Sequence, residues 1–294
     1  MSYPDGRGGR KVNDLPQPNT WVEMQPPVDL SLPMDMPERW AFEIEDLYEV
    51  WCGRLMRNRT RYAYYDGKNR LKDFGISTPP ELLTVETVVG WPNKAVMALA
   101  TRSRFDGFTA DTDEVQAALN AVARRSSLHV KYRQTVEAEG VYGCSFATVG
   151  MTDAGARIDM WDAEHATARW DDAKGHVAYG MTVEVCADGW MALTLYDEEA
   201  NVRAWTDGTG WSWEAQQHSM GRPLMAAFAY RPTQRKPFGQ SRITRAVMSI
   251  TDSAVRCALG GDISFQFAVA PQKYLIGADR NALGNKLRLL PMHS

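Results

Sequence analysis

The string GQSRI at residues 239–243 comes one residue short of the G-x-S-x-G turn that presents a nucleophilic serine. Such a turn needs a strand that runs directly into a helix, with glycine at the fifth position because the two elements pack closely there. Here the fifth residue is Ile243, and the preceding string RPTQRKP is a proline-bounded loop. We therefore expect Ser241 to be the N-cap of a helix, and a serine hydrolase acting through Ser241 is the less favoured alternative.

Other catalytic and metal-binding patterns are not found. The chain has five histidines, and none lies in an H-x-x-x-H, H-E-x-x-H or Cys/His spacing that would assemble a metal site. Neither the G-x-x-x-x-G-K-[ST] loop nor the G-x-G-x-x-G loop that bind nucleotide phosphates occurs in the sequence. We therefore expect no enzyme, no cofactor and no metal.

A basic and aromatic stretch, RLMRNRTRYAYYDGKNRLK at residues 54–72, could bind nucleic acid. Cations can follow the phosphates of a strand, and aromatic rings can stack on its bases. The alternatives are a helix end with solvated cations and core-packed tyrosines, or a contact between subunits, where tyrosine and arginine are enriched. The candidate residues are Arg54, Arg57, Arg59, Arg61, Tyr62, Tyr64, Tyr65 and Lys68.

Helices must position this stretch, because apolar residues recur there at helical spacing. Trp40, Ile44, Leu47, Trp51 and Leu55 predict a helix of about five turns that ends before Gly67. Two more helical stretches follow, GWPNKAVMALATRSRF and DTDEVQAALNAVARRSSLHVKYRQTVEAE. In the second, we expect Asp111 or Thr112 to cap the helix, Val115, Leu119 and Val122 to form its apolar face, and Ser126–Ser127 to join two helices.

From Val141 the sequence changes to short runs with turn signals about every ten residues, such as TDAG, DAKG and CADG. This pattern predicts an antiparallel meander. Because helices come first, strands follow and a helix closes the pattern, the fold class is α+β.

The composition bounds the class of protein. A chain of 294 residues with a formal charge of −3 can bury a core, and its overall field neither drives nor forbids contact with nucleic acid. The four cysteines are far apart and predict reduced thiols. No apolar run approaches the ~20 residues that cross a bilayer, so we expect no membrane partner. Residues 1–37 are rich in proline and glycine and predict a disordered or extended arm.

The helix that follows Ser241 is two-faced. Its apolar stripe contains Ile243, Val247, Ile250, Ala254 and Cys257. Local rules would end it at Gly260–Gly261. The polar stripe on the other side is formed by Arg242, Arg245, Ser249, Asp252 and Arg256.

Several strings, in the same order, resemble the portal proteins of tailed bacteriophages, particularly those of long-tailed phages that infect actinobacteria. The resemblance covers about residues 38–279. The strings are YYDGKNRLKDFGISTPPEL, VVGWPNKAVMALATRSRFDGF, LYDEE with the later GRPLMAAFAYRP, then PFGQSRITRAVMSITDSAVR and APQKYLIGAD.

The resemblance implies a structural subunit of a ring, usually of twelve copies, at one capsid vertex, through which double-stranded DNA is packaged and ejected. It implies partners, namely further copies of the chain, the terminase, capsid proteins and head-completion proteins, and a location in the virion after assembly in the host cytoplasm. Residues 38–236 would form the α+β wing, 237–270 a stem helix that continues through the two glycines to about Val269, and 271–294 the start of the clip and a divergent tail. The polar stripe of the stem helix would then face DNA or neighbouring subunits.

After Asp279 the string RNALGNKLRLLPMHS no longer resembles the family. The sequence therefore predicts a truncated portal, of the kind a decaying prophage would encode. Without a second stem helix, we expect the isolated chain to be poorly soluble or not to assemble into a ring.

Overall fold

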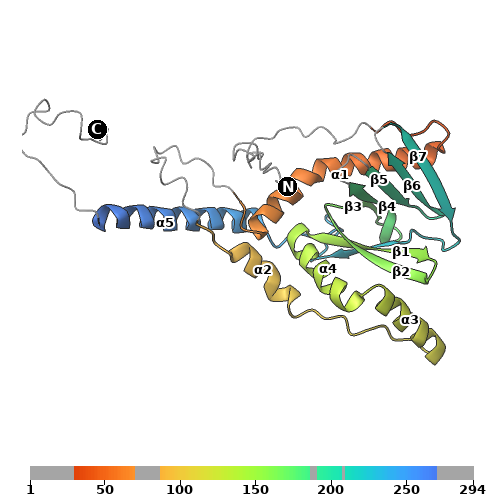
Figure 1. Cartoon of the computed structure of the whole chain (residues 1–294), viewed down its shortest axis with the longest axis horizontal. Coiled ribbons are helices and arrows are strands. Elements are labelled where there is room, and N and C mark those ends of the chain that lie inside the picture. Colours follow the sequence, from red (N-terminus) through yellow and green to blue (C-terminus); the bar gives the residue numbers. More distant parts are fainter. Residues whose placement is uncertain (1–29, 70–86, 186–190, 207–208, 270–294) are drawn as a thin grey trace, which may run out of the picture. The chain divides into compact units, whose positions relative to one another are not determined.

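The computed structural model describes residues 30–69, 87–185, 191–206 and 209–269, and Figure 1 shows the order of their elements. The order of helices, antiparallel strands and a final helix confirms the predicted α+β class. The helices are α1 (Glu38–Tyr65), α2 (Trp91–Ala100), α3 (Asp113–Arg125), α4 (Leu128–Tyr142) and α5 (Arg245–Val269). The strands are β1 (Cys144–Thr152), β2 (Gly155–Asp162), β3 (Ala166–Asp171), β4 (His176–Val185), β5 (Met191–Tyr196), β6 (Ala200–Thr206), β7 (Trp211–Gln217) and β8 (Met225–Ala229).

The chain divides into two units. The first contains residues 1–76 and 88–252, and the second contains residues 77–87 and 253–294. All side-chain contacts and the pocket described below belong to the first unit. In the second unit, the described residues are Thr87 and the continuation of α5 from Ser253 to Val269.

The main core lies between α1 and the five-stranded sheet. The predicted apolar face of α1 is confirmed, since Ile44, Leu47, Trp51 and Leu55 are all buried. They pack in one cluster with buried residues of β4, β5 and β6. The helix has 28 residues, which is longer than the predicted five turns.

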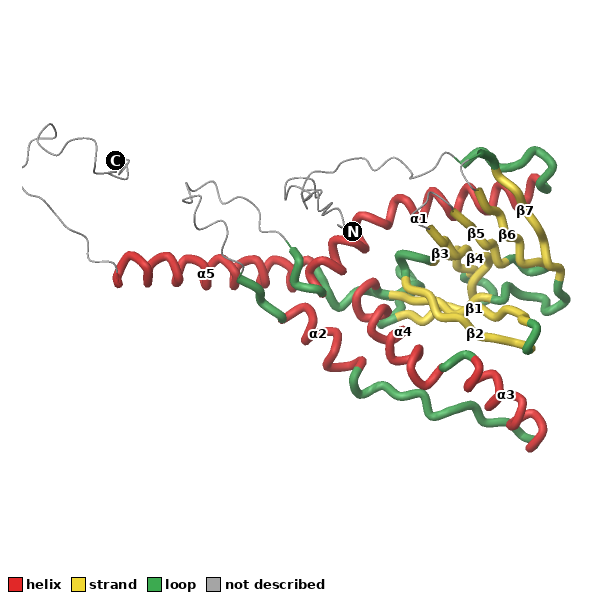
Figure 2. Tube along the Cα trace, in the orientation of Figure 1, coloured by secondary structure: helices red, strands yellow, loops and turns green. Residues whose placement is uncertain are grey.

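The strands form two antiparallel sheets rather than one meander (Figure 2). The first sheet has the order β2-β1-β8, and the second has the order β3-β4-β5-β6-β7. β8 does not extend the meander beyond β7 but returns to β1, pairing Cys144 with Ala229 and Thr148 with Met225. Local turn signals identify each hairpin, but they cannot show this pairing because the two strands are far apart in the sequence.

Helices α3 and α4 lie beside the three-stranded sheet. Ser127 joins them with a left-handed backbone, at φ 52°, and Thr112 caps α3 by accepting from the Val115 amide, so both predictions are confirmed. The predicted apolar face of α3 is only partly covered, since Val115 is 50% exposed and no residue of α3 is fully buried. The helix packs mainly along β2 and α4.

Two predicted boundaries move. Residues 30–37, assigned to the arm from sequence, pack against the main core through Leu30, Leu32 and the buried Met36. The last helix begins at Arg245 and continues through Gly260–Gly261 to Val269, as the resemblance to portal proteins predicted. The expected clip strand, residues 272–277, lies outside the described residues.

Candidate functional site

Three arginines of the predicted basic and aromatic stretch line one pocket of about 590 Å³. Arg54, Arg57 and Arg61 stand at positions i, i+3 and i+7 of α1, a spacing that places them on one face of a helix. Asn58 and Trp51 share this face and also line the pocket. The helical period therefore turns a basic string of the sequence into one wall of a pocket.

The opposite wall of the pocket comes from residues far along the chain. Arg169 belongs to β3, Arg235 and Lys236 to the loop after β8, and Arg245 is the first residue of α5. The pocket thus has seven cationic side chains, and none of the described residues that line it is acidic. Arg169, Arg235 and Lys236 were not predicted from the sequence, although the loop string RPTQRKP was a visible signal.

Hydrogen bonds to backbone carbonyls fix the α1 wall. The Trp51 indole donates to the Glu164 carbonyl at 2.7 Å, and the Asn58 amide donates to the Ala163 carbonyl at 2.9 Å. Arg61 donates to the Tyr142 carbonyl at 2.7 Å. Because these carbonyls lie between β2 and β3 and at the end of α4, they hold the helix face in place.

The loop wall is held by close backbone contacts around Gly239. Gly239 has φ +71°, and a Cβ there would lie 2.4 Å from the Tyr230 carbonyl oxygen and 2.6 Å from that of Gly143. The Gln240 amide donates to the Tyr230 carbonyl at 2.8 Å, and the Arg242 amide donates to the Gly140 carbonyl at 2.9 Å. The loop is therefore joined to the ends of α4 and β8.

Ser241 lies in this loop and is not the helix cap. Its buried hydroxyl donates to the Val141 carbonyl and accepts from the Ile243 amide at 2.9 Å. Thr244 caps the helix instead, because its hydroxyl accepts from the Val247 amide at 3.3 Å. The prediction of Ser241 as the N-cap is wrong by three residues, and its buried, hydrogen-bonded hydroxyl does not support the serine hydrolase alternative.

The crowded cations of the pocket affect one another. Burial lowers the pKa of the Arg54 guanidinium, and repulsion by Arg57 and Arg169 lowers it further. Burial and repulsion by Arg57 lower the pKa of Arg61 to about 10. Burial also raises the pKa of the Cys144 thiol, which lines the pocket, to about 11, so this thiol is neutral near pH 7. The pocket is thus lined by crowded cations, of which Arg169 is paired with a carboxylate, that of Asp46.

The predicted tyrosines lie away from the pocket. Tyr64 donates to the Asp252 carboxylate at 2.8 Å, and Tyr65 donates to Glu137. Both tyrosines pack against a small core cluster, which agrees with the structural alternative. Tyr62 is exposed and packs its ring near that of Tyr65.

The remaining predicted cations of this stretch are dispersed. Lys68 pairs with Asp66 on the surface. Arg59 is exposed and does not line the pocket, and Lys72 lies outside the described residues. The structure thus separates the arginines that share a pocket from the rings that were expected to stack on bases.

The five polar candidates around α5 occupy different environments. Arg242 precedes the helix, so it is not on the helix face, and its guanidinium donates to the Ala95 carbonyl at 2.6 Å and to the Tyr230 hydroxyl at 2.6 Å. Arg245 lines the cationic pocket and Asp252 accepts from Tyr64. The other two, Ser249 and Arg256, are exposed on α5.

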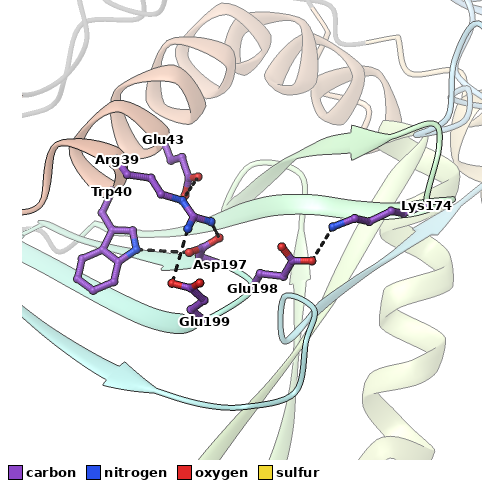
Figure 3. A network of polar contacts seen from close by, with 7 residues as sticks. All are labelled: Arg39, Trp40, Glu43, Lys174, Asp197, Glu198 and Glu199. Carbon is purple, nitrogen blue, oxygen red and sulfur yellow. Dashed lines mark hydrogen bonds and ion pairs between the residues drawn. The ribbon is translucent and has the colours of Figure 1, made fainter.

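A second polar cluster, shown in Figure 3, lies at the start of α1. Arg39 is 3.2 Å from Glu43, 2.8 Å from Asp197 and 3.6 Å from Glu199, and Trp40 donates to Asp197 at 3.4 Å. We call these five residues the Arg39 network. It contains its own counter-charges and joins the helix to the turn between β5 and β6.

No protein-family model matches the chain. The portal protein of Mycobacterium phage D29 is 25% identical to it over 242 residues, which cover 77% of this chain and 49% of that protein. The portal protein of Mycobacterium phage L5 is 25% identical over 238 residues, which cover 76% of this chain and 48% of that protein. This chain resembles phage portal proteins. The resemblance predicted from its sequence is therefore confirmed.

The chain spans about half the length of the portal proteins it matches. Within the described residues, no helix is both long and apolar enough to cross a membrane. The same residues contain no group of three or more His, Cys, Asp or Glu side chains that could hold a metal ion.

Proposed function

We propose that this chain is a structural, non-enzymatic subunit of a phage portal, the ring at one capsid vertex through which DNA enters and leaves. The observation that carries the proposal is its similarity to two portal proteins over about three-quarters of its length. In this proposal the helices and sheets before residue 237 form the wing, and α5 forms the first stem helix.

The dimensions of α5 support the proposed stem. Its 25 residues span about 37 Å at 1.5 Å per residue. Ser249 and Arg256 are exposed on it, and we assign them to the face that meets DNA or a neighbouring subunit. The proposed ring requires a head-to-tail contact between identical subunits whose rotation closes. The proposed partners are further copies of the chain, terminase, capsid and head-completion proteins, and the DNA itself.

Immunogold labelling of the protein in virions tests the proposal. The gene is tagged at its natural locus, particles are purified, and the tag is detected by immunogold electron microscopy. We expect label at one vertex of each particle, where the tail joins. Label spread over the shell, or tagged protein that never enters particles, would overturn the proposal. The same tag on the major capsid protein is the control, because it labels the whole shell.

A further inference from the structure

The cationic pocket between α1, β3 and the loop before α5 has more positive charge than its surroundings neutralise. Of its seven cations, Arg169 pairs with Asp46. Arg54, Arg57, Arg235, Lys236 and Arg245 have no ion pair or side-chain hydrogen bond among the described residues. Such clustering opposes folding, because like charges repel and partly buried ones lose solvation.

Burial distinguishes this pocket from an ordinary basic surface. Arg54 and Arg61 are half-buried, and the pocket also contains the rings of Trp51, Trp170 and Phe238. Solvent therefore screens Arg54 and Arg61 less than it screens surface lysines. The other unpaired cations, Arg57, Arg235, Lys236 and Arg245, are exposed. Thr167 adds a buried hydroxyl that has no hydrogen-bond partner among the described residues. Donor groups in the wall of the pocket thus remain unused.

The charges and the volume indicate the class of ligand. Guanidinium groups donate parallel N–H bonds that match the oxygens of phosphate. A single carboxylate would neutralise only one of these cations, whereas a compact polyphosphate brings several negative charges into the same space. The volume of about 590 Å³ is typical of small-ligand sites. A DNA duplex is too wide to enter it and could place only backbone phosphates at the rim.

We propose that this pocket binds phosphate groups carried by a compact polyanion, held by Arg54, Arg57 and Arg235 from its two walls. The phosphate could belong to a free polyphosphate compound or to the backbone of DNA. Either source would supply the negative charge that the pocket lacks. All residues that line the pocket belong to the first unit, so phosphate binding there does not depend on assembly into a ring.

Calorimetry and thermal unfolding of the full chain at low ionic strength test the proposal, with sodium tripolyphosphate as the free-phosphate probe. We expect one binding site per chain, a higher midpoint of unfolding, and affinity that falls steeply with salt. The test variant is Arg57→Ala with Arg235→Ala, because both side chains are exposed and their removal leaves the core intact. It should lower affinity by at least about tenfold. The matched control is Arg102→Ala with Arg222→Ala, two exposed arginines outside the pocket, and it should bind like the unmodified chain.

Two further probes identify the source of the phosphate. A short DNA duplex that binds and is displaced by tripolyphosphate would identify backbone phosphate as the ligand, whereas binding of tripolyphosphate alone would identify a free compound. Both results support the site. A glutamate-rich peptide that binds more tightly than tripolyphosphate would overturn the proposal. So would the absence of binding to the unmodified chain, or equal binding to the test variant. A test variant that unfolds at a lower temperature without ligand would show that its arginines stabilise the fold and would likewise count against it.

Discussion

The two ends of α1 hold arginines in opposite ways. At its start, Arg39 lies among the carboxylates of Glu43, Asp197 and Glu199. Four turns later, Arg54 and Arg57 face a pocket whose described lining has no carboxylate. The ion pairs of Arg39 join α1 to the turn between β5 and β6. Arg54 and Arg57 have no such partner among the described residues and are available to a ligand. The charge of a residue therefore says little about its role until its counter-charge is found.

The largest expected effect comes from the backbone that holds the pocket wall. Gly239→Ala would place a Cβ against the carbonyl oxygens of Tyr230 and Gly143. We expect it to lower the free energy of unfolding by about 3 kcal/mol or more, measured by urea denaturation. Gly175→Ala is the matched control, since Gly175 has the same φ of +71° but no heavy atom within 4 Å of the added Cβ. Its cost should be about 1 kcal/mol, and equal costs would show that contact around Gly239 is unimportant.

The direct test of the comparison removes one charged residue from each region. Asp197→Ala deletes the buried acceptor of Arg39 and Trp40 and should cost about 2 kcal/mol of unfolding free energy. Arg57→Ala removes an unpaired cation and should change stability by no more than about 0.5 kcal/mol. Chemical denaturation of both variants in the same low-salt buffer measures the difference. If Arg57→Ala costs as much as Asp197→Ala, the pocket cations stabilise the fold and the contrast disappears.

A smaller effect should appear as a change in pH dependence at the Arg39 network. Burial raises the pKa of Glu43, and repulsion by Asp197 adds to this shift, while Arg39 opposes it. A carboxyl whose pKa is raised in the folded state keeps its proton longer there, so its contribution to stability is lost as pH rises from about 4.5 through the folded pKa.

Glu43→Gln removes that loss. Its Oε2 atom is buried without a hydrogen-bond partner among the described residues, so the substitution removes a charge from this position and keeps the Oε1 acceptor of Arg39. We expect the variant to gain up to about 1 kcal/mol relative to the unmodified chain between pH 4 and pH 7. Thermal unfolding across this range measures the gain, and a constant difference between the two proteins would contradict the assigned cause. Glu45→Gln serves as the control, because Glu45 is exposed on the same helix and is not a member of the Arg39 network.

The smallest effect is expected from removing the counter-charge of Arg169. Asp46 neutralises Arg169 and accepts from the Tyr179 hydroxyl at 2.9 Å. Asp46→Asn should cost only about 0.5 kcal/mol, because this pair is partly exposed. It should also raise the affinity for tripolyphosphate about two- to fivefold at low salt, as measured by calorimetry. Unchanged affinity would show that Arg169 does not contribute to the charge felt by the ligand.

Local patterns in the sequence predicted the elements that depend on neighbouring residues. The apolar period gave α1, Thr112 gave the cap of α3, and turn signals gave most strands. They could not predict contacts between distant segments. Ser241 and Thr244 are both acceptable caps, and Val141, which lies 100 positions before Ser241, determines that Ser241 is used elsewhere.

The candidate site shows the same limit. Arg54, Arg57 and Arg61 were selected because they are close in sequence, and helical spacing places them on one face. The cations opposite them, such as Arg169 and Arg235, are more than 100 positions away, so no local period relates the two walls. The neighbouring tyrosines were grouped with the arginines for the same reason, although the helix directs Tyr64 toward Asp252.

The continuous helix through Gly260–Gly261 has a consequence for hydrogen exchange. Each glycine costs about 1 kcal/mol relative to alanine inside a helix, and an added Cβ at either position would meet no heavy atom of the described residues within 4 Å. The hydrogen bonds of α5 should therefore open most often around these two residues, and their amides should exchange with heavy water before those near Thr251, which is buried. A helix that appears uniform in its backbone would then behave as two protected segments separated by a short stretch of rapid opening.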